Sequence, residues 1–407
     1  MIEKYCSSLY ITYDGLLEPL GQSQILPYVE RLAELGIGFW VLSFEKPSDL
    51  KRADAAKRMK DRLGSRGIEW IPLRYHKSPS APATAWDALH GLVVALWISL
   101  RHRVSVVHAR SYVPALIGAA VKTLTGSKLI FDMRGFWPEE RVDGNLWRAG
   151  GRLYRAAKWC EGLLLGRSDS IVVLTNRAKE ILLTDAYQSR IRSGVPVTVI
   201  PCCTDVSRFR VQRTGLGNGD GPVRKTIVYA GSVGTWYMLD EMLDFFRTAQ
   251  RLDPDLHFLI LNRHEPEKVK QVLSRKGFSP SDVTVAAADF DEMPTYLARA
   301  FAGMYFITPA FSKVGSSPTK LAEYLAAGVP VIVSRDIGDS ADQVSQHRLG
   351  VVVNRFDEEE YRTKWVQFVS LVRSDGEIRS RCRQVAAEQL SMEFGMTRYG
   401  QVYEDIC

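Results

Sequence analysis

The sequence contains few cysteines, and none of them is spaced as metal ligands usually are. There is no CxxC pair among the six, which are Cys6, Cys160, Cys202, Cys203, Cys382 and Cys407. We therefore expect no zinc site.

The features of an exported protein are also missing. Residues 1–15 (MIEKYCSSLYITYDG) have neither the basic stretch nor the sustained apolar run of a signal peptide. We expect a cytoplasmic protein whose thiols stay reduced.

No hydrophobic run is long enough to cross a bilayer. The longest, residues 89–100, is too short to span and includes His90. We expect a buried helix here. A helix lying on a membrane surface remains an alternative, because Trp86, Trp97 and the RHR of residues 101–103 flank or belong to the run.

The loop after the first expected strand, residues 5–12, lacks the GxGxxG of dinucleotide-binding folds. It reads DGLLEPLGQSQ, in which Gly21 and Gln22 would allow a ligand to approach the backbone. A plain connection from strand to helix fits the same residues.

Composition indicates a large globular protein with an uneven charge. The 407 residues are 46% apolar, which suffices for two or three domains with buried cores. The net charge is +7. Residues 1–200 hold 28 basic and 19 acidic residues (+9), whereas the remainder holds 25 and 27 (−2). A basic first half suits an anionic membrane or substrate better than nucleic acid, because no RNA-binding motif accompanies the charge.

Short apolar strands alternate with helices along the whole chain. This pattern predicts parallel sheets covered on both faces, an α/β protein of two doubly wound, Rossmann-like domains with ligands at the carboxyl ends of the strands. The expected parts are a first domain (1–205), a glycine-rich linker (206–223), a second domain (224–390) and a terminal helix (391–407). For that helix, packing back onto the first domain is one option.

Two strand ends in the first half carry charged side chains where open parallel sheets place ligands. His108 and Arg110 end one strand, and Asp132 and Arg134 follow the next. A structural histidine and a simple Asp132–Arg134 ion pair are the plainer interpretations.

Residues 316–332 (SSPTKLAEYLAAGVPVI) carry the strongest signal. Ser317 is the expected N-cap, Pro318 the first helical residue and Gly328 the residue that ends the helix. Lys320 lies in the first turn, where the helix dipole disfavours a cation unless an anion such as phosphate binds there. Glu323, one turn further, would accept hydrogen bonds from ribose hydroxyls. An ordinary capped surface helix is the alternative.

These residues resemble the donor-binding segment of retaining glycosyltransferases with the GT-B fold, in family 4 (glycosyl transferases group 1). The stretches HARSYVPALIGA, KLIFDMRGFW, SIVVLTNRAKEIL, VIPCCTDVSRF and IVYAGSVG agree with that family in order along the chain. The resemblance implies transfer of a sugar from a nucleotide sugar to an acceptor hydroxyl with retention, and neither a metal nor another cofactor.

The resemblance also suggests roles for single residues. It implies that Glu323 grips the ribose, that Ser316, Ser317 and Lys320 meet the pyrophosphate, and that Gly21 lets phosphate approach. Asp132 and Arg134 fall where the family often has a histidine on the donor sugar, and with Lys320 they are the catalytic candidates. The resemblance further implies that the first domain (1–205) binds the acceptor and the second (224–390) the nucleotide sugar, which places His108 and Arg110 on the acceptor side.

The chain departs from the family at two places. Gly315 stands where the family has a glutamate. The family's Arg and Lys after the first strand of the second domain are also missing, and GSVGTWY offers Ser232 and Tyr237 instead, with Gly231 and Ser232 as candidate donor contacts. Arg263 and Lys320 are the candidates for supplying the missing charge.

The expected partners are a nucleotide-sugar donor, a glycan or lipid-linked acceptor in surface polysaccharide or other glycoconjugate synthesis, and an anionic inner membrane surface, with no nucleic acid. The base of the donor is not readable from the sequence. A nucleotide-sugar epimerase of the same fold and a non-catalytic nucleotide-sugar-binding protein are the rival interpretations.

Overall fold

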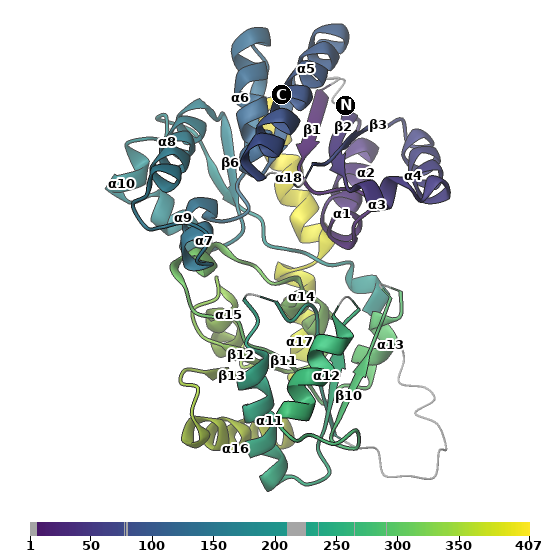
Figure 1. The fold of residues 1–407 in the computed structure, drawn as a ribbon, viewed down its shortest axis with the longest axis vertical. Coiled ribbons are helices and arrows are strands. Elements are labelled where there is room, and N and C mark those ends of the chain that lie inside the picture. The colour runs from purple at the N-terminus through teal and green to yellow at the C-terminus, as the bar shows by residue number, and fades with distance from the viewer. Residues whose placement is uncertain are drawn as a thin grey trace. The chain divides into compact units, whose positions relative to one another are not determined.

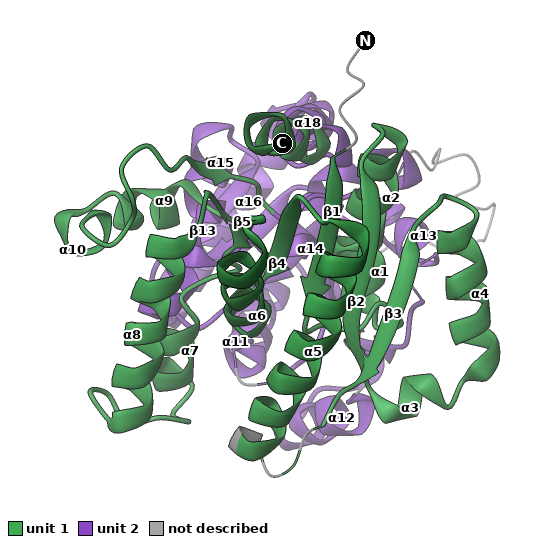
Figure 2. Cartoon of the chain, turned by 90° about the horizontal axis from the view of Figure 1, so that it is seen from above, with its two compact units in different colours: residues 1–201, 395–407 green, residues 202–394 purple. Residues whose placement is uncertain are grey.

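The structure is a computed structural model that describes residues 6–76, 78, 80–209, 225–234, 236–263, 265–289 and 291–407. The chain forms two compact units. Unit 1 is Met1–Pro201 with Gly395–Cys407, and unit 2 is Cys202–Phe394; Figure 2 colours them green and purple. Most of the expected linker lies outside the described residues. The division into units falls after Pro201, a few residues before the expected domain end.

Unit 1 is built on a seven-stranded parallel sheet in the order β3-β2-β1-β4-β5-β6-β7. Figure 1 labels β1, β2, β3 and β6 of this sheet. The strands are β1 (Ser7–Thr12), β2 (Gly38–Glu45), β3 (Glu69–Arg74), β4 (Val106–Arg110), β5 (Lys128–Asp132), β6 (Ser170–Val173) and β7 (Val197–Val199).

The helices of unit 1 cover both faces of this sheet. They are α1 (Pro19–Gln24), α2 (Leu26–Glu34), α3 (Pro47–Leu50), α4 (Ala53–Gly64), α5 (Ser80–His102), α6 (Tyr112–Thr125), α7 (Trp137–Asp143), α8 (Arg152–Arg167), α9 (Asn176–Leu182), α10 (Asp185–Gln188) and most of α18 (Met392–Ile406). Because parallel crossovers are right-handed, α5, α6 and α8 lie on one face, and α2 and α4, which connect strands in the opposite direction, lie on the other. The helix α18 packs on the α2 face, where Tyr399 contacts Tyr28.

Unit 2 repeats the architecture with a six-stranded parallel sheet in the order β10-β9-β8-β11-β12-β13. Its strands are β8 (Thr226–Ala230), β9 (His257–Leu261), β10 (Val283–Ala286), β11 (Ala302–Tyr305), β12 (Val331–Ser334) and β13 (Gly350–Val353). Its helices are η1 (Val206–Phe209), α11 (Leu239–Leu252), α12 (Pro266–Arg275), α13 (Met293–Ala298), η2 (Phe311–Gly315), α14 (Thr319–Ala326), α15 (Ser340–Gln346), α16 (Glu358–Ser374) and α17 (Ile378–Gln389). The predicted fold class, two doubly wound α/β units, is confirmed.

The region after β1 differs from the expectation. Gly21 and Gln22 lie in the short helix α1 and not in a loop. Ile25 separates α1 from α2. Gly21 is required there by packing, because a Cβ at this position would come within 2.1 Å of the Gly15 carbonyl oxygen.

The expectation of reduced thiols is wrong for one pair. Cys6, directly before β1, and Cys407, directly after α18, form a disulfide. Both cysteines lie within unit 1. No spacing pattern predicts this pair, because the two cysteines are 401 residues apart.

The helix α5 is not the buried helix that its composition predicts. It packs on the sheet along one face, but Trp86, Leu89, Val93, Trp97 and Leu100 are 56–66% exposed. Within the described residues, Pro82–His102 is also the one stretch with the length and composition of a membrane span.

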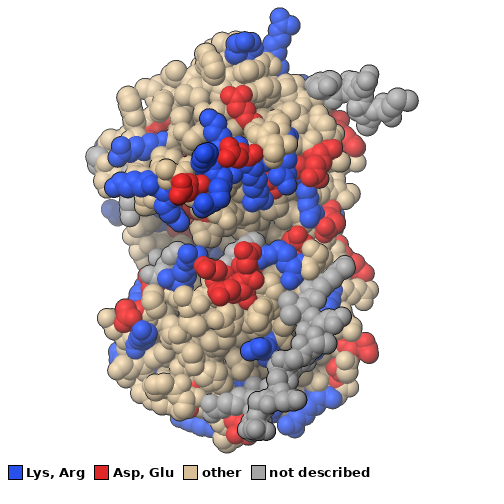
Figure 3. All heavy atoms as spheres, turned by 90° about the vertical axis from the view of Figure 1, so that its right-hand side faces the viewer, with Lys and Arg blue, Asp and Glu red and all other residues tan. Residues whose placement is uncertain are grey.

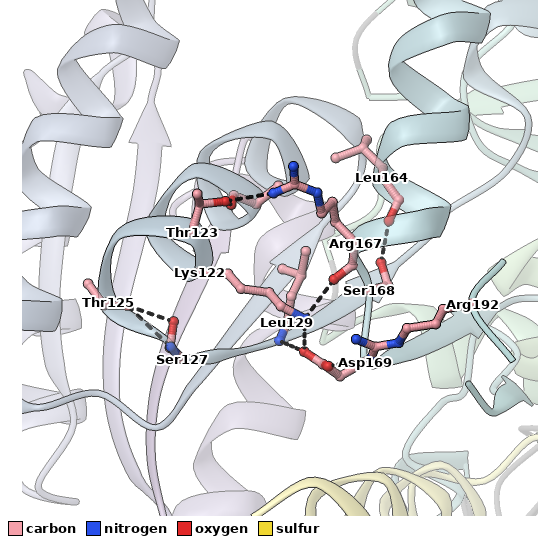
Figure 4. Close-up of polar contacts among 11 residues, drawn as sticks. Lys122, Thr123, Thr125, Ser127, Leu129, Leu164, Arg167, Ser168, Asp169 and Arg192 are labelled. Carbon is pink, nitrogen blue, oxygen red and sulfur yellow. Dashed lines mark hydrogen bonds and ion pairs between the residues drawn. The ribbon is translucent and has the colours of Figure 1, made fainter. Parts of the chain in front are cut away.

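A polar cluster joins α6, β5 and α8 at one end of unit 1 (Figure 4). Asp169, directly after α8, accepts hydrogen bonds from the Lys122 ammonium, from the Leu129 amide at 2.8 Å and from Arg192 at 2.7 Å. Although burial acts in the opposite direction, these donors hold the pKa of Asp169 below its ordinary value.

Candidate active site

The helix α14 begins one residue later than the sequence suggests. Pro318 and not Ser317 is the N-cap, and no side chain caps the first turn. The Ser317 hydroxyl instead accepts a hydrogen bond from the Cys202 amide at 3.1 Å. Gly328 ends the helix with φ +71°, as expected. Since a proline has no side-chain acceptor, the first amides of α14 are left without a side-chain cap.

Lys320 is buried in an aromatic pocket and not on the surface. Its side chain is 8% exposed, and Nζ lies 3.9 Å from the ring centre of Tyr237 and 5.3 Å from that of Tyr229. The ammonium lowers the pKa of the Tyr237 hydroxyl. Within the parts of unit 2 that the structure describes, no carboxylate forms an ion pair with Lys320.

Gly231 makes room for this lysine. A Cβ on Gly231 would come within 2.7 Å of Nζ, and its φ of +144° suits glycine alone. The loop is fixed by two hydrogen bonds: the Asn262 amide group donates to the Gly231 carbonyl at 2.9 Å, and the Tyr229 hydroxyl donates to the Ser232 carbonyl. The predicted donor residues Gly231 and Lys320 are therefore brought together.

Glu323 lies half-buried one turn along α14. Burial raises its pKa to about 7, against the opposing fields of Lys320 and Arg208. Arg208, from η1, faces this carboxylate and was not among the predicted site residues. It lies in the stretch VIPCCTDVSRF that resembles the family, but no role was assigned to it.

The other predicted donor residues differ in their exposure and in whether their charge is already paired. Ser316 is half-buried directly before α14, and the Ser232 side chain is exposed in the loop after β8. Arg263 is exposed and its charge is engaged by Asp289 at 2.6 Å. Lys313, which the sequence analysis did not select, is buried 3.7 Å from the ring centre of Trp236.

In unit 1, the loop before α1 is held by a buried carboxylate. Glu45 accepts hydrogen bonds from the Leu16 and Leu17 amides at 2.6 and 3.2 Å, and burial raises its pKa. Gln22, predicted as a ligand contact, is exposed and donates to the Leu17 carbonyl at 3.3 Å.

The charged strand ends of β4 and β5 meet around Asp132, which is fully buried. Its carboxylate lies 3.4 Å from Arg134, 3.7 Å from Arg110 and 3.8 Å from the Nε2 of His108. Burial opposes ionisation of Asp132, but Arg134, His108 and Arg110 outweigh it and lower its pKa. Burial lowers the pKa of His108.

Two tyrosines of α18 complete this cluster. The Tyr399 hydroxyl donates to Asp132 at 3.0 Å, and the Tyr403 hydroxyl is hydrogen-bonded to His108 Nδ1 at 2.9 Å. No sequence motif predicts these contacts, because Tyr399 and Tyr403 lie more than 250 residues from Asp132 and His108 in the sequence. Arg134, with a side chain 16% exposed, is the member of the charged set that reaches solvent most, since Asp132, His108 and Arg110 are 0–3% exposed.

No group of His, Cys, Asp or Glu among the described residues is arranged to hold a metal ion. The charged groups at both sites are instead lysines and arginines with carboxylates between them. Such sets bind anions and hydroxyl groups.

Comparisons with known proteins agree with this chemistry. Residues 22–192 match the model of the glycosyl transferase 4-like domain, and residues 224–370 match that of the glycosyl transferases group 1. A search of the curated proteins finds no match.

Solved structures share the fold at low identity. A glycosyltransferase from Rickettsia africae is 16% identical with a TM-score of 0.73, covering 100% of this chain and 99% of its own. Sucrose-phosphate synthase from Thermosynechococcus elongatus is 12% identical (TM-score 0.74; 98% and 99% covered). HepE from Anabaena, in complex with UDP and glucose, is 13% identical (TM-score 0.69; 98% and 100% covered).

The two family models lie in the two units in the order that GT-B enzymes have, and the solved structures extend over both. The chain therefore belongs to the family 4, group 1 glycosyltransferases and is an enzyme of glycosyl transfer.

Proposed function

We propose that this enzyme moves a sugar from a nucleotide-sugar donor to an acceptor hydroxyl with retention at the anomeric carbon, in the synthesis of a surface polysaccharide, glycolipid or other glycoconjugate. Neither a metal nor another cofactor takes part in this scheme. The UDP and UDP-glucose bound by HepE make uridine nucleotides the first donors to test.

The observation that carries the proposal is the buried ammonium of Lys320. The ammonium is hydrogen-bonded to the Tyr237 hydroxyl, but no carboxylate among the described residues forms an ion pair with it. A buried charge without an ion-pair partner is costly. The pyrophosphate of a donor would supply the missing negative charge at the uncapped start of α14.

This arrangement suits the chemical step. As the bond between sugar and phosphate breaks, negative charge grows on the departing nucleoside diphosphate, and Lys320 with the first amides of α14 would stabilise it. One oriented donor of this kind contributes about 3 kcal/mol to catalysis. The departing phosphate can itself accept the proton of the incoming hydroxyl on the same face of the sugar, so the scheme needs no protein nucleophile.

Glu323 is placed one turn deeper, where its carboxylate would accept hydrogen bonds from the ribose hydroxyls. Ser316, Ser317, Gly231 and Ser232 would line the phosphate end. In unit 1 we assign the contact with sugar or acceptor to Arg134. Asp132, which is too buried to touch a ligand, would position Arg134 and Arg110.

The test combines a donor panel with single substitutions. Thermal shift with UDP, GDP, ADP and dTDP sugars identifies the donor, and NMR of the product reports the anomeric configuration. We expect Lys320→Ala to lower kcat about a hundredfold with the fold intact. Lys270→Ala, which changes an exposed lysine of α12 in the same unit, is the matched control. Full turnover by Lys320→Ala would refute the phosphate assignment.

An epimerase of the same fold is the second candidate, because the donor site alone does not separate it from a transferase. An epimerase converts its nucleotide sugar in the absence of any acceptor. Release of free nucleoside diphosphate only when an acceptor is added would exclude it. Binding without any turnover would favour the non-catalytic alternative.

A further inference from the structure

The outward face of α5 is a continuous apolar stripe. Trp86, Leu89, Val93, Trp97 and Leu100 recur every three or four residues, so they line one side of the helix, and each is more than half exposed. A surface helix of a water-soluble protein normally presents polar side chains there.

The inward face of α5 packs on the unit through small and aliphatic residues. Ala83, Gly91, Ala95 and Ile98 are buried, and a Cβ on Gly91 would come within 2.8 Å of Phe44 and 2.9 Å of Ile117. Both tryptophans of the helix lie on the outward face. The helix is therefore apolar on both faces, whereas a helix packed on the surface of a water-soluble protein needs only one apolar face.

The stripe belongs to a wider apolar surface. Among the described residues, nine of the sixteen exposed large hydrophobic side chains lie on α5, α6 and α8, which cover the same face of the unit 1 sheet. Unit 2 has three. The additional members are Leu116, Leu124, Leu153 and Trp159. A concentration of this kind marks a binding surface.

The charges on these three helices are of one sign. Their two carboxylates, Asp87 and Glu161, are buried and bonded, Asp87 to the Tyr13 hydroxyl and Glu161 to the Tyr112 hydroxyl. The exposed charged residues of the three helices are basic, and they are Arg101, Arg152, Arg155 and Arg167. By contrast, Figure 3 shows the side of unit 1 that carries α4, where Lys and Arg lie among Asp and Glu.

We propose that the α5–α6–α8 surface docks on an anionic lipid bilayer, with α5 lying in the plane of the interface. The tryptophans suit the headgroup boundary, the aliphatic side chains suit the acyl region, and the arginines suit acidic headgroups. A water-soluble protein partner would not need both the arginine-only charge and the exposed tryptophans.

The helix lies on the bilayer and does not cross it. Asp87 accepts hydrogen bonds from Tyr13 at 3.0 Å and from the His76 amide at 3.0 Å, and these contacts, with the packing of Gly91, hold α5 on the sheet. Crossing would require all of them to break. Docking itself does not depend on the proposed function. Combined with it, docking selects a lipid-linked acceptor over a soluble glycan.

The experiment measures sedimentation of the full chain with vesicles of phosphatidylcholine, with and without 30% phosphatidylglycerol. We expect binding to the anionic vesicles, weakening at high salt, and at least tenfold weaker binding by Val93→Asp. The matched control is Val366→Asp on α16 of unit 2, because the two valines are 59% and 56% exposed. For charge, Arg152→Glu with Arg155→Glu is compared with Lys57→Glu with Arg58→Glu on α4.

Any one of three results would overturn the proposal. The first is a wild-type chain that stays in solution with anionic vesicles, and the second is a Val366→Asp variant whose binding is weakened as much as that of Val93→Asp. The third is a chain that forms a dimer through α5 without binding vesicles. The outcome is separate from that of the proposed function, since Val93→Asp should still bind nucleotide sugar as the wild type does.

Discussion

At Lys320 the chain buries a positive charge between two tyrosine rings and against a glycine. The sequence identified Lys320 and Glu323 through helix capping and spacing. It did not predict the aromatic pocket, because Tyr229 belongs to a strand and Tyr237 to the loop after it, and neither position signals contact with a distant lysine. The contacts of Tyr399 and Tyr403 in the Asp132 cluster were not predicted for the same reason.

Gly231→Ala should displace the Lys320 ammonium. The added Cβ would lie 2.7 Å from Nζ, and the φ of +144° disfavours alanine. We expect kcat to fall at least tenfold in a steady-state transfer assay. Gly234→Ala is the control in the same loop, because a Cβ there meets no atom within 4 Å. Equal turnover by the two variants would contradict the role given to Gly231.

Donor affinity should depend on pH through Glu323. Its pKa of about 7 means that the carboxylate, which in the proposed donor site would accept the hydrogen bonds of the ribose, is present above pH 7 and is lost as the pH falls. At pH 6 only about a tenth remains ionised. We expect calorimetry with a nucleotide sugar, whose pyrophosphate does not titrate in this range, to give markedly weaker binding at pH 6 than at pH 8.

Glu323→Gln separates this effect from others. The amide cannot ionise, so the affinity of the variant for the nucleotide sugar should be weak and nearly constant from pH 6 to pH 8. An unchanged pH dependence in the variant would assign the titration to another group.

Among the elements, strands were the most predictable. Short apolar runs between polar residues predict strands over residues 128–132, 226–230 and 283–286, and β5, β8 and β10 have these bounds, because such runs have few alternatives in an α/β chain. The helices α7 and α10 were not predicted, because they are too short to show a clear periodicity. The error on α5 is different in kind: hydrophobic composition indicates a need for burial, but not whether protein or lipid provides it.

The Asp169 cluster should stabilise the packing of α6 and α8 on β5. Asp169→Asn keeps the shape but weakens the bonds to Lys122 and Arg192. Since hydrogen bonds to charged groups contribute about 1.5–3 kcal/mol each, we expect a loss of about 2 kcal/mol in the free energy of unfolding at pH 7. Urea denaturation followed by circular dichroism measures it, with the exposed Asp185→Asn as control.

The sign of the pH dependence follows from the lowered pKa of Asp169. Its contribution is complete well above the unfolded-state pKa of about 3.9 and disappears as the pH falls through the folded-state value. The gap between wild type and Asp169→Asn should therefore narrow from pH 7 towards pH 3. A constant gap would mean that the carboxylate charge does not matter.

For the whole molecule, the alternation of strands and helices was enough to predict two doubly wound units. It could not predict the Cys6–Cys407 disulfide, because connectivity over 401 residues depends on where the final helix packs. The order of strands in each sheet likewise came from the structure alone.

Breaking the disulfide should destabilise unit 1 but leave it folded. Closing a very long loop lowers the entropy of the unfolded chain, which in the chain-entropy model stabilises the folded state by about 6 kcal/mol. We expect reductant to lower the thermal midpoint of the wild type and to leave Cys407→Ser unaffected. The denatured wild type should present four reactive thiols, the free cysteines Cys160, Cys202, Cys203 and Cys382. Six thiols before reduction would show that the bond is absent.

The return of the chain to unit 1 through α18 imposes an order on biosynthesis. A ribosome releases residues 1–201 long before Tyr399 and Tyr403, which finish the surroundings of Asp132 and His108. Unit 2, contiguous from Cys202 to Phe394, can fold while the chain is being synthesised, whereas unit 1 stays incomplete until residues 395–407 have been added. A nascent chain stalled before residue 395 should therefore yield its N-terminal half to protease sooner than the finished protein does.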